Sequence, residues 1–186
     1  ISTLIETHSP QAIIFEDYDK GCITKSLIAS VIKTAVSKGI KVTVDPKKKN
    51  FFSYTGATLF KPNMKELREG LNMPHLKSND IDLMKAYSSL QEKMQVESAF
   101  FTLSADGVFI TDGDEQHHLA ALNRTIADVS GAGDTVISAA TCALSVGMDL
   151  KDIATISNLA GGWVCQFPGV VSITQSDLLA EINKSL

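Results

Sequence analysis

Length, composition and charge exclude several classes of protein before any motif is considered. The chain has 186 residues, 44% of them hydrophobic, and a formal net charge of −4, which suits one sizeable core and argues against nucleic acid as a partner. It has three cysteines outside any CxxC spacing and no apolar run of membrane-spanning length. We therefore expect a cytoplasmic protein with no disulfide framework, zinc site or membrane partner.

The first two-thirds of the chain alternates short apolar runs with amphipathic segments. This alternation predicts an α/β protein with a mainly parallel sheet. Strands are predicted at residues 12–16, 41–45, 57–61 and 99–103, and helices at residues 24–38, 63–69 and 80–94. Residues 106–120 are predicted to form a β-hairpin with its turn at 112–114, so part of the sheet is expected to be antiparallel.

The last third is predicted to be mostly helical. Helices are expected at residues 132–146, 150–166 and 176–186, with Ser176 as the N-cap of the last one. Helix 132–146 has small or apolar residues almost all round, so we expect it to be buried. The chain contains no internal repeat and no Pro/Ser-rich linker, which predicts a single domain over residues 1–186.

Polar clusters follow the predicted strands. EDYDKG comes after the first strand, DPKKK after the second, KPNMKE after the third and TLSADG after the fourth. In open α/β sheets, ligands bind at the carboxyl ends of the strands. The repeated placement of polar clusters at one edge of the sheet predicts a shared site there.

The stretch ADVSGAGDTVISAA, residues 127–140, places glycines and an aspartate at the start of a helix. Glycines allow a tight turn there, and the helix N-terminus offers bare N–H groups and partial positive charge, which together make an anion site. An aspartate in the first turn also complements the helix dipole without any ligand. This motif alone does not decide between the two interpretations.

Two motifs together resemble a known family. DVSGAGD (residues 128–134), with PNMKE (residues 62–66) upstream, is similar to the D-T-x-G-A-G-D and N-x-x-E signatures of the ribokinase-like (PfkB) family of ATP-dependent carbohydrate kinases. The segments EDYDKG, VDPKKKNFFSYTGATLFKPNMKE, TLSADGVFI and NLAGGWVCQFPGVVSIT look most like heptose 7-phosphate kinases, the kinase half of bacterial ADP-heptose synthases. The resemblance implies a ribokinase-like three-layer α/β/α fold and ATP-dependent phosphoryl transfer to a hydroxyl of a sugar or sugar phosphate.

By that resemblance, Asp134 is the catalytic base that takes the proton of the acceptor hydroxyl as it attacks the γ-phosphate. Gly131, Ala132 and Gly133 would offer backbone N–H groups to the charge that develops on the transferring phosphoryl group. Phosphoryl transfer needs an oriented nucleophile and neutralised charge, and a carboxylate beside a helix N-terminus suits that chemistry.

The resemblance also implies cation sites. Asn63 and Glu66 would help to hold Mg²⁺ near the ATP phosphates, and Mg²⁺ needs few protein ligands because it keeps several waters. The alternative for this pair is a helix cap with a solvated glutamate. Asp128 matches the first aspartate of the motif, which contributes to a monovalent-cation site in many members. Activation by K⁺ is left open.

The nucleotide side of the site is implied in the same way. TLSADG matches a loop that is commonly T-x-G-x-x-G, here with Thr102, Ser104 and Gly107, so that Ser104 replaces the first glycine. Asn158 and Gly162 lie where the family packs a helix against the adenine of ATP. Ordinary packing against a neighbouring element explains the glycine equally well.

Three charged residues are candidates for substrate binding. Lys47 could neutralise a phosphate on the acceptor or on ATP, and Asp17 and Lys20 are placed near the site by the resemblance. The alternative for each of them is ordinary surface charge.

Family members carry a further N-terminal portion with a glycine-rich sugar-binding segment and the strands of a lid. We therefore expect residues 1–186 to be a partial domain, the C-terminal ATP-binding and catalytic portion, with a sheet edge that leaves a homodimer open. A kinase acting on a free sugar, such as a ribokinase or fructokinase, and an inactive nucleotide-binding fragment remain alternatives. A Rossmann dehydrogenase is excluded because no GxGxxG follows the first strand.

Overall fold

The computed structural model describes residues 1–185 and has a six-stranded sheet with the order β1-β2-β3-β4-β5-β6. The strands are β1 (Ala12–Glu16), β2 (Lys41–Asp45), β3 (Leu59–Phe60), β4 (Ser98–Thr102), β5 (Val108–Thr111) and β6 (Gln116–Leu119). The first four pair in parallel, and β4, β5 and β6 pair antiparallel. The predicted mainly parallel α/β sheet with an antiparallel hairpin is confirmed.

Strand β3 is shorter than predicted. Its ladder covers two residues instead of residues 57–61. The amide of Thr58 still bonds to Val42 and that of Lys61 to Val44, but Pro62 follows at once and has no N–H to continue the ladder.

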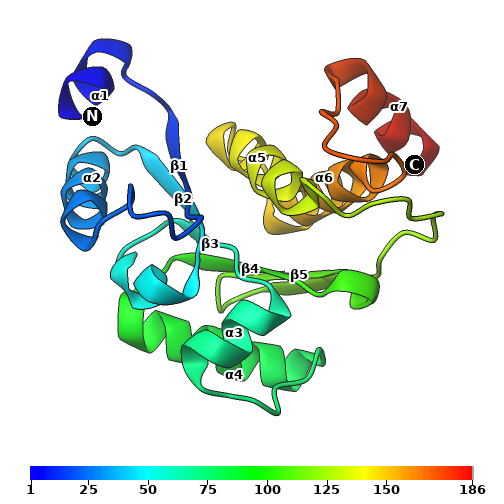
Figure 1. Ribbon diagram of the computed structural model, residues 1–186, viewed down its shortest axis with the longest axis horizontal. Coiled ribbons are helices and arrows are strands. Elements are labelled where there is room, and N and C mark those ends of the chain that lie inside the picture. Colours follow the sequence, from blue (N-terminus) through cyan, green and yellow to red (C-terminus); the bar gives the residue numbers. More distant parts are fainter. Residues whose placement is uncertain (186) are drawn as a thin grey trace.

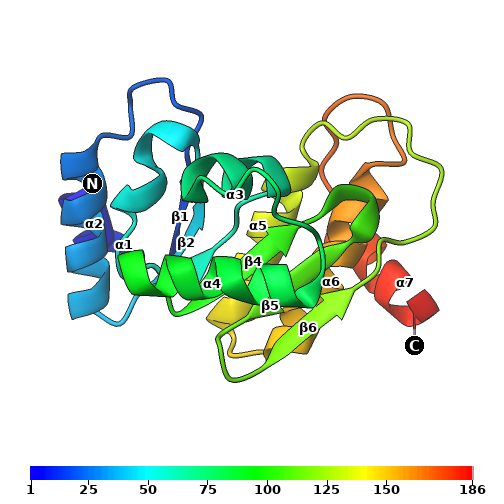
Figure 2. The ribbon, with the colours of Figure 1, turned by 90° about the horizontal axis from the view of Figure 1, so that it is seen from below.

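Three helices cover one face of the sheet: α2 (Lys25–Ser37), α3 (Met64–Leu71) and α4 (Asp80–Met94). Thr24, Asn63 and Asn79 cap their N-termini with side-chain oxygens, which satisfies amides that have no partner inside the helix. Figure 2 shows α4 lying across β4 and β5. The larger core lies under these helices and includes Ile28, Val31, Leu67, Leu83, Leu90, Phe101 and Phe109.

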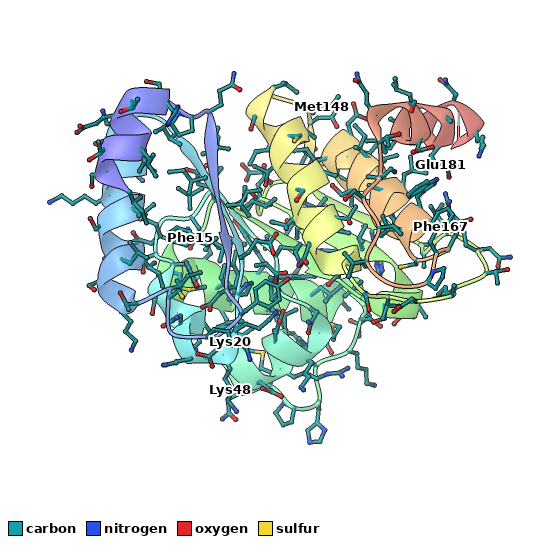
Figure 3. All side chains as sticks on the ribbon, turned by 45° about the horizontal axis from the view of Figure 1, so that its top comes forward. Phe15, Lys20, Lys48, Met148, Phe167 and Glu181 are labelled. Carbon is teal, nitrogen blue, oxygen red and sulfur yellow. The ribbon has the colours of Figure 1, made fainter. Side chains whose placement is uncertain are left out.

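Helices α5 (Ala132–Ser145) and α6 (Leu150–Val164) cover the opposite face, so the fold has three layers (Figure 1). Their core includes Leu59, Phe100, Ile110, Val136, Ile137, Ala140, Ile153 and Ala154. The expectation that α5 is buried all round is wrong, because Ser138 and Cys142 are exposed. That side of α5 lines a pocket of about 620 Å³, whose other lining residues include segment 170–173 and Met148, labelled in Figure 3. The small side chains of α5 therefore pack in the core on one side of the helix and line the pocket on the other.

The ends of the chain differ most from expectation. Helix α1 (Ser2–His8) and the short 3-10 helices η1 (Lys48–Ser53) and η2 (Ser104–Asp106) were not predicted, and they are too short to show a clear periodicity. Helix α7 (Gln175–Ser185) begins one residue before Ser176, and the hydroxyl of Thr174 accepts from the amide of Asp177, so Ser176 is not the N-cap. Leu186, predicted as its last residue, lies outside the described residues.

Two further observations concern the cysteines and the helices of the described part of the chain. Cys22, Cys142 and Cys165 are all free. None of the helices within residues 1–185 combines the length and apolar character that crossing a bilayer requires.

Candidate active site

Charged side chains end three adjacent parallel strands. Glu16 of β1 is paired in register with Asp45 of β2, and the amide of Lys61, directly after β3, donates to the carbonyl of Val44. Two residues before Asp45, the hydroxyl of Thr43 bonds to a threonine of α5 at 2.7 Å. Because side chains alternate along a strand, Asp45 lies on the same face as Thr43, towards α5. Parallel pairing and alternation thus bring these charges into one row.

Helix α5 adds a third carboxylate to this row. Asp134 lies in the first turn of α5, and single oxygen atoms of Glu16, Asp45 and Asp134 lie within 4.8 Å of one another. The phenol of Tyr18 donates to Asp134 Oδ2 at 2.7 Å. Asp134 therefore already accepts a hydrogen bond from a hydroxyl group, as it would from an alcohol.

The environment of Glu16 favours a proton. Burial, then a hydrogen bond to Asp134 and the charges of Asp134 and Asp45, raise the pKa of Glu16 to about 7. The hydrogen bond to Asp134 raises the pKa of Tyr18 to about 12, so this phenol stays protonated at neutral pH. Glu16 consequently keeps a proton through part of the neutral range, next to Asp134.

The three carboxylates are close enough for a metal ion, but the structure already supplies a cation beside them. Lys61 is 2% exposed, and its Nζ lies 3.1 Å from Asp45 Oδ2. An ammonium at this place neutralises one carboxylate, and a proton on Glu16 removes the charge of a second. Lys61 thus supplies positive charge at the place where these carboxylates meet.

The N-terminus of α5 has donors without acceptors. Gly131 is its N-cap, with φ of 78°, and no side chain caps the helix. Of the predicted anion-binding residues, Ala132 donates to Val129 at 3.2 Å, whereas the amides of Gly131 and Gly133 meet no hydrogen-bond acceptor within residues 1–185. A Cβ on Gly133 would lie 3.6 Å from Asp45 Oδ2 and 3.7 Å from Lys61 Nζ, so Gly133 stands next to the charged row.

Asn63 and Glu66 meet at the start of α3. Asn63 Oδ1 accepts from the amide of Glu66 and Glu66 Oε2 from the amide of Asn63, both at 2.9 Å, which is a capping box. Lys47 donates to Glu66 Oε1 at 2.5 Å and lies 3.8 Å from Asp45. Burial opposes the charge of Lys47, but the bond to Glu66 and the nearby carboxylates raise its pKa. Lys47 thus links the pair to the charged row.

The other two residues predicted to bind substrate are not drawn into this cluster by any contact that the structure shows. Asp17 is 3% exposed and accepts from Tyr54 at 2.8 Å and Asn50 at 3.0 Å. Burial raises the pKa of Tyr54, which therefore remains a donor. Asp17 anchors the loop after β1, and Lys20 is exposed on that loop (Figure 3).

The predicted nucleotide loop lies beside Asn63. Thr102 forms an isolated parallel bridge with Asn63, and the loop then folds into η2. Ser104 has φ of 55°, a left-handed conformation that explains why the resembling motif has glycine here. Gly107 has φ of 92°, and a Cβ on it would lie 2.0 Å from the carbonyl of Leu119, so only glycine fits.

Asn158 and Gly162 face the segment that follows β6. Asn158 donates to the carbonyl of Ala120 at 3.0 Å, and a Cβ on Gly162 would lie 3.2 Å from Leu122. The packing explanation for Gly162 is therefore present in the structure, and the adenine-binding role remains a prediction.

Asp128 holds the loop before α5. Its Oδ1 accepts from the amide and hydroxyl of Ser130 at 3.0 and 2.8 Å, and its Oδ2 accepts from the amide of Gly169 at 3.0 Å. Hydrogen bonds from Ser130 and then Gly169 lower the pKa of this carboxyl. The carboxylate thereby ties the glycine-rich turn to the chain beyond α6.

Glu16, Tyr18, Asp45 and Lys61 lie in polar segments that the sequence predicts at a shared site, but none of these four residues was given a role there. The sequence contains a signal for three of them, because the predicted strands 12–16, 41–45 and 57–61 each end in a charged residue. Each of these side chains faces the same side of the sheet as the residue two positions earlier in its strand. Their meeting with Asp134 also depends on how α5 crosses the sheet, which no local pattern contains.

Comparison with known sequences identifies relatives over almost the whole chain. A profile of the pfkB family carbohydrate kinases matches residues 23–177. The Bifunctional protein HldE of Methylobacillus flagellatus is 37% identical over 95% of this chain and 36% of its own length. The Bifunctional protein HldE of Helicobacter hepaticus is 38% identical over 92% of this chain and 35% of its own length.

Solved structures share the fold at low sequence identity. A ribokinase from Arabidopsis thaliana, complexed with ribose and ATP, has a TM-score of 0.81 at 17% identity, over 97% of this chain and 58% of that one. Phosphofructokinase-2 from Escherichia coli, in complex with potassium, has a TM-score of 0.77 at 20% identity, over 88% of this chain and 54% of that one. The ribokinase-like fold is thereby confirmed, and this chain spans little more than half of those structures.

Proposed function

The chain belongs to the pfkB family of carbohydrate kinases, and from that premise we propose that it carries the catalytic and nucleotide-binding portion of an ATP-dependent sugar kinase. The observation that carries the proposal is the contact between Asp134 and Tyr18, with O–H donation to Oδ2 at 2.7 Å at the N-terminus of α5. A carboxylate that accepts a hydroxyl donor beside unused helix amides has the geometry of a base for phosphoryl transfer.

In this mechanism the acceptor hydroxyl takes the place of the Tyr18 hydroxyl on Asp134. Its proton passes to Asp134 while its oxygen bonds to the γ-phosphorus of ATP, and the bond from that phosphorus to the ADP oxygen breaks. The amides of Gly131 and Gly133 donate to the oxygens on which negative charge develops. In other enzymes, removing one hydrogen-bond donor of this kind costs about 3–4 kcal/mol of transition-state stabilisation.

We assign magnesium to Asn63 and Glu66. An amide oxygen and a carboxylate suit Mg²⁺, which takes one or two protein oxygens and completes its shell with waters and phosphates. When bound, the ion supplies charge neutralisation for the ATP phosphates. The capping box holds Glu66 in place for this role, and Lys47 neutralises its charge in the absence of a ligand.

The nucleotide would lie between the loop of Thr102, Ser104 and Gly107 and the α6 residues Asn158 and Gly162. The bridge between Thr102 and Asn63 supports this placement, because it sets the loop beside the proposed magnesium residues. Asp128 is the residue to which we would assign K⁺, since phosphofructokinase-2 from Escherichia coli is solved with potassium.

For the acceptor we propose a heptose 7-phosphate. The resemblance of the segments around Asp17, Lys20 and Lys47 to heptose 7-phosphate kinases supports it, and Lys47 offers a compact cation for a phosphate. A free sugar is the alternative, because the ribokinase that shares this fold is solved with ribose. We further propose a cytoplasmic enzyme, with a homodimer as a possible assembly through the open edge at β1.

Calorimetric titration of Mg-ATP into this chain tests the nucleotide half. We expect binding heat that EDTA abolishes and that Glu66→Gln weakens, whereas Glu69→Gln, an exposed glutamate of the same helix, leaves it unchanged. Equal binding by both variants would contradict the magnesium assignment.

Turnover is tested on the whole protein that contains these residues, since this chain spans 36% of the length of its relative from Methylobacillus flagellatus. ADP release is measured with a panel of free sugars and sugar phosphates in K⁺ and Na⁺ salts. We expect release with a heptose 7-phosphate, and absence of release with every acceptor would refute the kinase proposal.

A further inference from the structure

The proposed reaction leaves one buried cation unexplained. Lys61 is 2% exposed at the end of β3, and a buried ammonium is costly unless it is paired. The partner that the described residues provide is Asp45 Oδ2, 3.1 Å from Lys61 Nζ. The motif that identified the site, PNMKE, begins one residue later, so Lys61 lies outside it.

Lys61 lies beneath the first turn of α5. Leu59, two residues earlier, packs in the core under α5 and α6, so alternation turns Lys61 to the same face. A Cβ on Gly133 would be 3.7 Å from Lys61 Nζ. The ammonium thus stands between the end of β2 and the helix that carries Asp134.

The groups that face this place come from every packed element. β1 and its loop bring Glu16 and Tyr18, β2 and its loop bring Asp45 and Lys47, α3 brings Glu66 and α5 brings Asp134. Carboxylates outnumber ammonium groups here, and Lys47 is already bonded to Glu66 at 2.5 Å. Lys61 is therefore the cation that balances the carboxylates beneath α5.

We propose that Lys61 is a positioning residue of the phosphoryl-transfer site, whose buried ammonium holds Asp45 in place and offsets the negative charge of the carboxylate row beneath α5. The role of Lys61 in phosphoryl transfer rests on the proposed function, whereas its effect on the neighbouring charges can be measured on this chain alone. Lys61 acts through Asp45 and Asp134 and transfers no proton itself.

The charges make a directional test possible. The pKa of Glu16 is raised mainly by burial and by Asp134, is raised further by Asp45, and is lowered by Lys61. Removing the ammonium must therefore raise the pKa of Glu16, and removing the Asp45 charge must lower it. If the substitutions only loosened the packing of the site, the pKa of Glu16 would instead fall towards its ordinary value in both variants.

The experiment is a carboxyl-carbon NMR titration of this chain with labelled Asp and Glu, with Lys61→Met, Asp45→Asn and Lys33→Met compared to the parent. Lys33 is exposed on α2, across the sheet from the site, so its variant is the matched loss of one lysine charge. Relative to the parent, we expect the apparent pKa of Glu16 to be about one unit higher in Lys61→Met, lower in Asp45→Asn and unchanged in Lys33→Met.

If Lys61→Met fails to fold, the Asp45→Asn shift and the double variant Lys61→Met/Asp45→Asn decide the matter, because the double variant removes both partners of the ion pair. The double variant is expected to titrate at higher pH than Asp45→Asn, because it also lacks the ammonium that lowers the pKa of Glu16. Shifts of the same sign in both single variants, or no shift in either, would overturn the proposal.

A second readout uses the pH profile of kcat/KM in the whole protein. With Lys61→Met the acid limb should move to higher pH, with a loss of about fivefold at pH 7 and an unchanged KM for ATP. Lys61→Arg keeps the charge and should restore the limb. If no acceptor supports turnover, the proposed function fails while the NMR titration still tests Lys61. A changed KM with an unmoved limb would contradict the positioning role.

Discussion

The N-termini of α3 and α5 lie at the same edge of the sheet but differ in how their backbone amides are capped. At α3, Asn63 and Glu66 satisfy each other's amides at 2.9 Å in a closed capping box. At α5, Gly131 provides no side-chain cap and leaves amides without acceptors in the described chain. Satisfied donors stabilise a helix, whereas unsatisfied donors are available to an anion. The contrast separates the end that positions Glu66 from the end that we propose as the phosphoryl site.

The largest effect is expected from the carboxylate at the open end. Asp134→Asn keeps the shape of the side chain but cannot accept the acceptor proton, so kcat should fall about 10³-fold with little change in the free energy of unfolding. Asp152→Asn, which changes a first-turn aspartate of α6, is the control and should leave kcat unchanged. Steady-state kinetics and urea unfolding make the comparison, and comparable kcat values for the two variants would refute the role of Asp134.

The next effect concerns the glycine that begins α5. Gly131→Ala puts a Cβ on a residue with φ of 78° and within 3.2 Å of Val170 Cγ1. The left-handed conformation should cost about 1–2 kcal/mol of the free energy of unfolding. Gly147→Ala also has φ of 78° but meets nothing within 4 Å, so a larger loss at Gly131 measures the contribution of the close contact.

Loss of the closed cap should be smaller. Asn63→Ala removes the side-chain acceptor of α3 and is expected to destabilise the chain by about 1 kcal/mol in urea unfolding. Asn79→Ala, which uncaps α4, should cost a similar amount. Calorimetry with Mg-ATP then distinguishes the caps, because only Asn63→Ala should weaken binding. Unweakened binding would leave Asn63 as a cap alone.

A separate effect is a pH dependence of stability. The pKa of Glu16 is raised in the fold from its model-compound value of 4.5 to about 7, so the folded chain binds the proton more tightly than the unfolded chain. Its contribution to stability is therefore complete below pH 4.5 and is lost as the pH rises through about 7. Urea unfolding between pH 5 and 8 should show this decline, and Glu16→Gln should flatten it. A Glu16→Gln curve parallel to that of the parent would contradict the raised pKa.

Local patterns predicted the elements that local forces control. The apolar run of β1, the spacing of α4 and the turn after β5 led to elements with nearly the observed bounds. Asn63 was correctly predicted as a helix cap, because a cap depends on residues three positions apart. Prediction failed at α1 and at the start of α7, where the helices are short or a nearby threonine competes for the cap.

The sequence by itself determined the order of strands and helices, the glycine turn and the aspartate that opens α5, since each depends on neighbouring residues. Only the tertiary structure decided that Glu16, Asp45 and Lys61 form a row beneath Asp134. Their meeting requires the pairing register of three strands and the path of α5 across them. Long-range packing sets that arrangement, and it brings separate charged residues into one cluster in which their charges shift the pKa of Glu16.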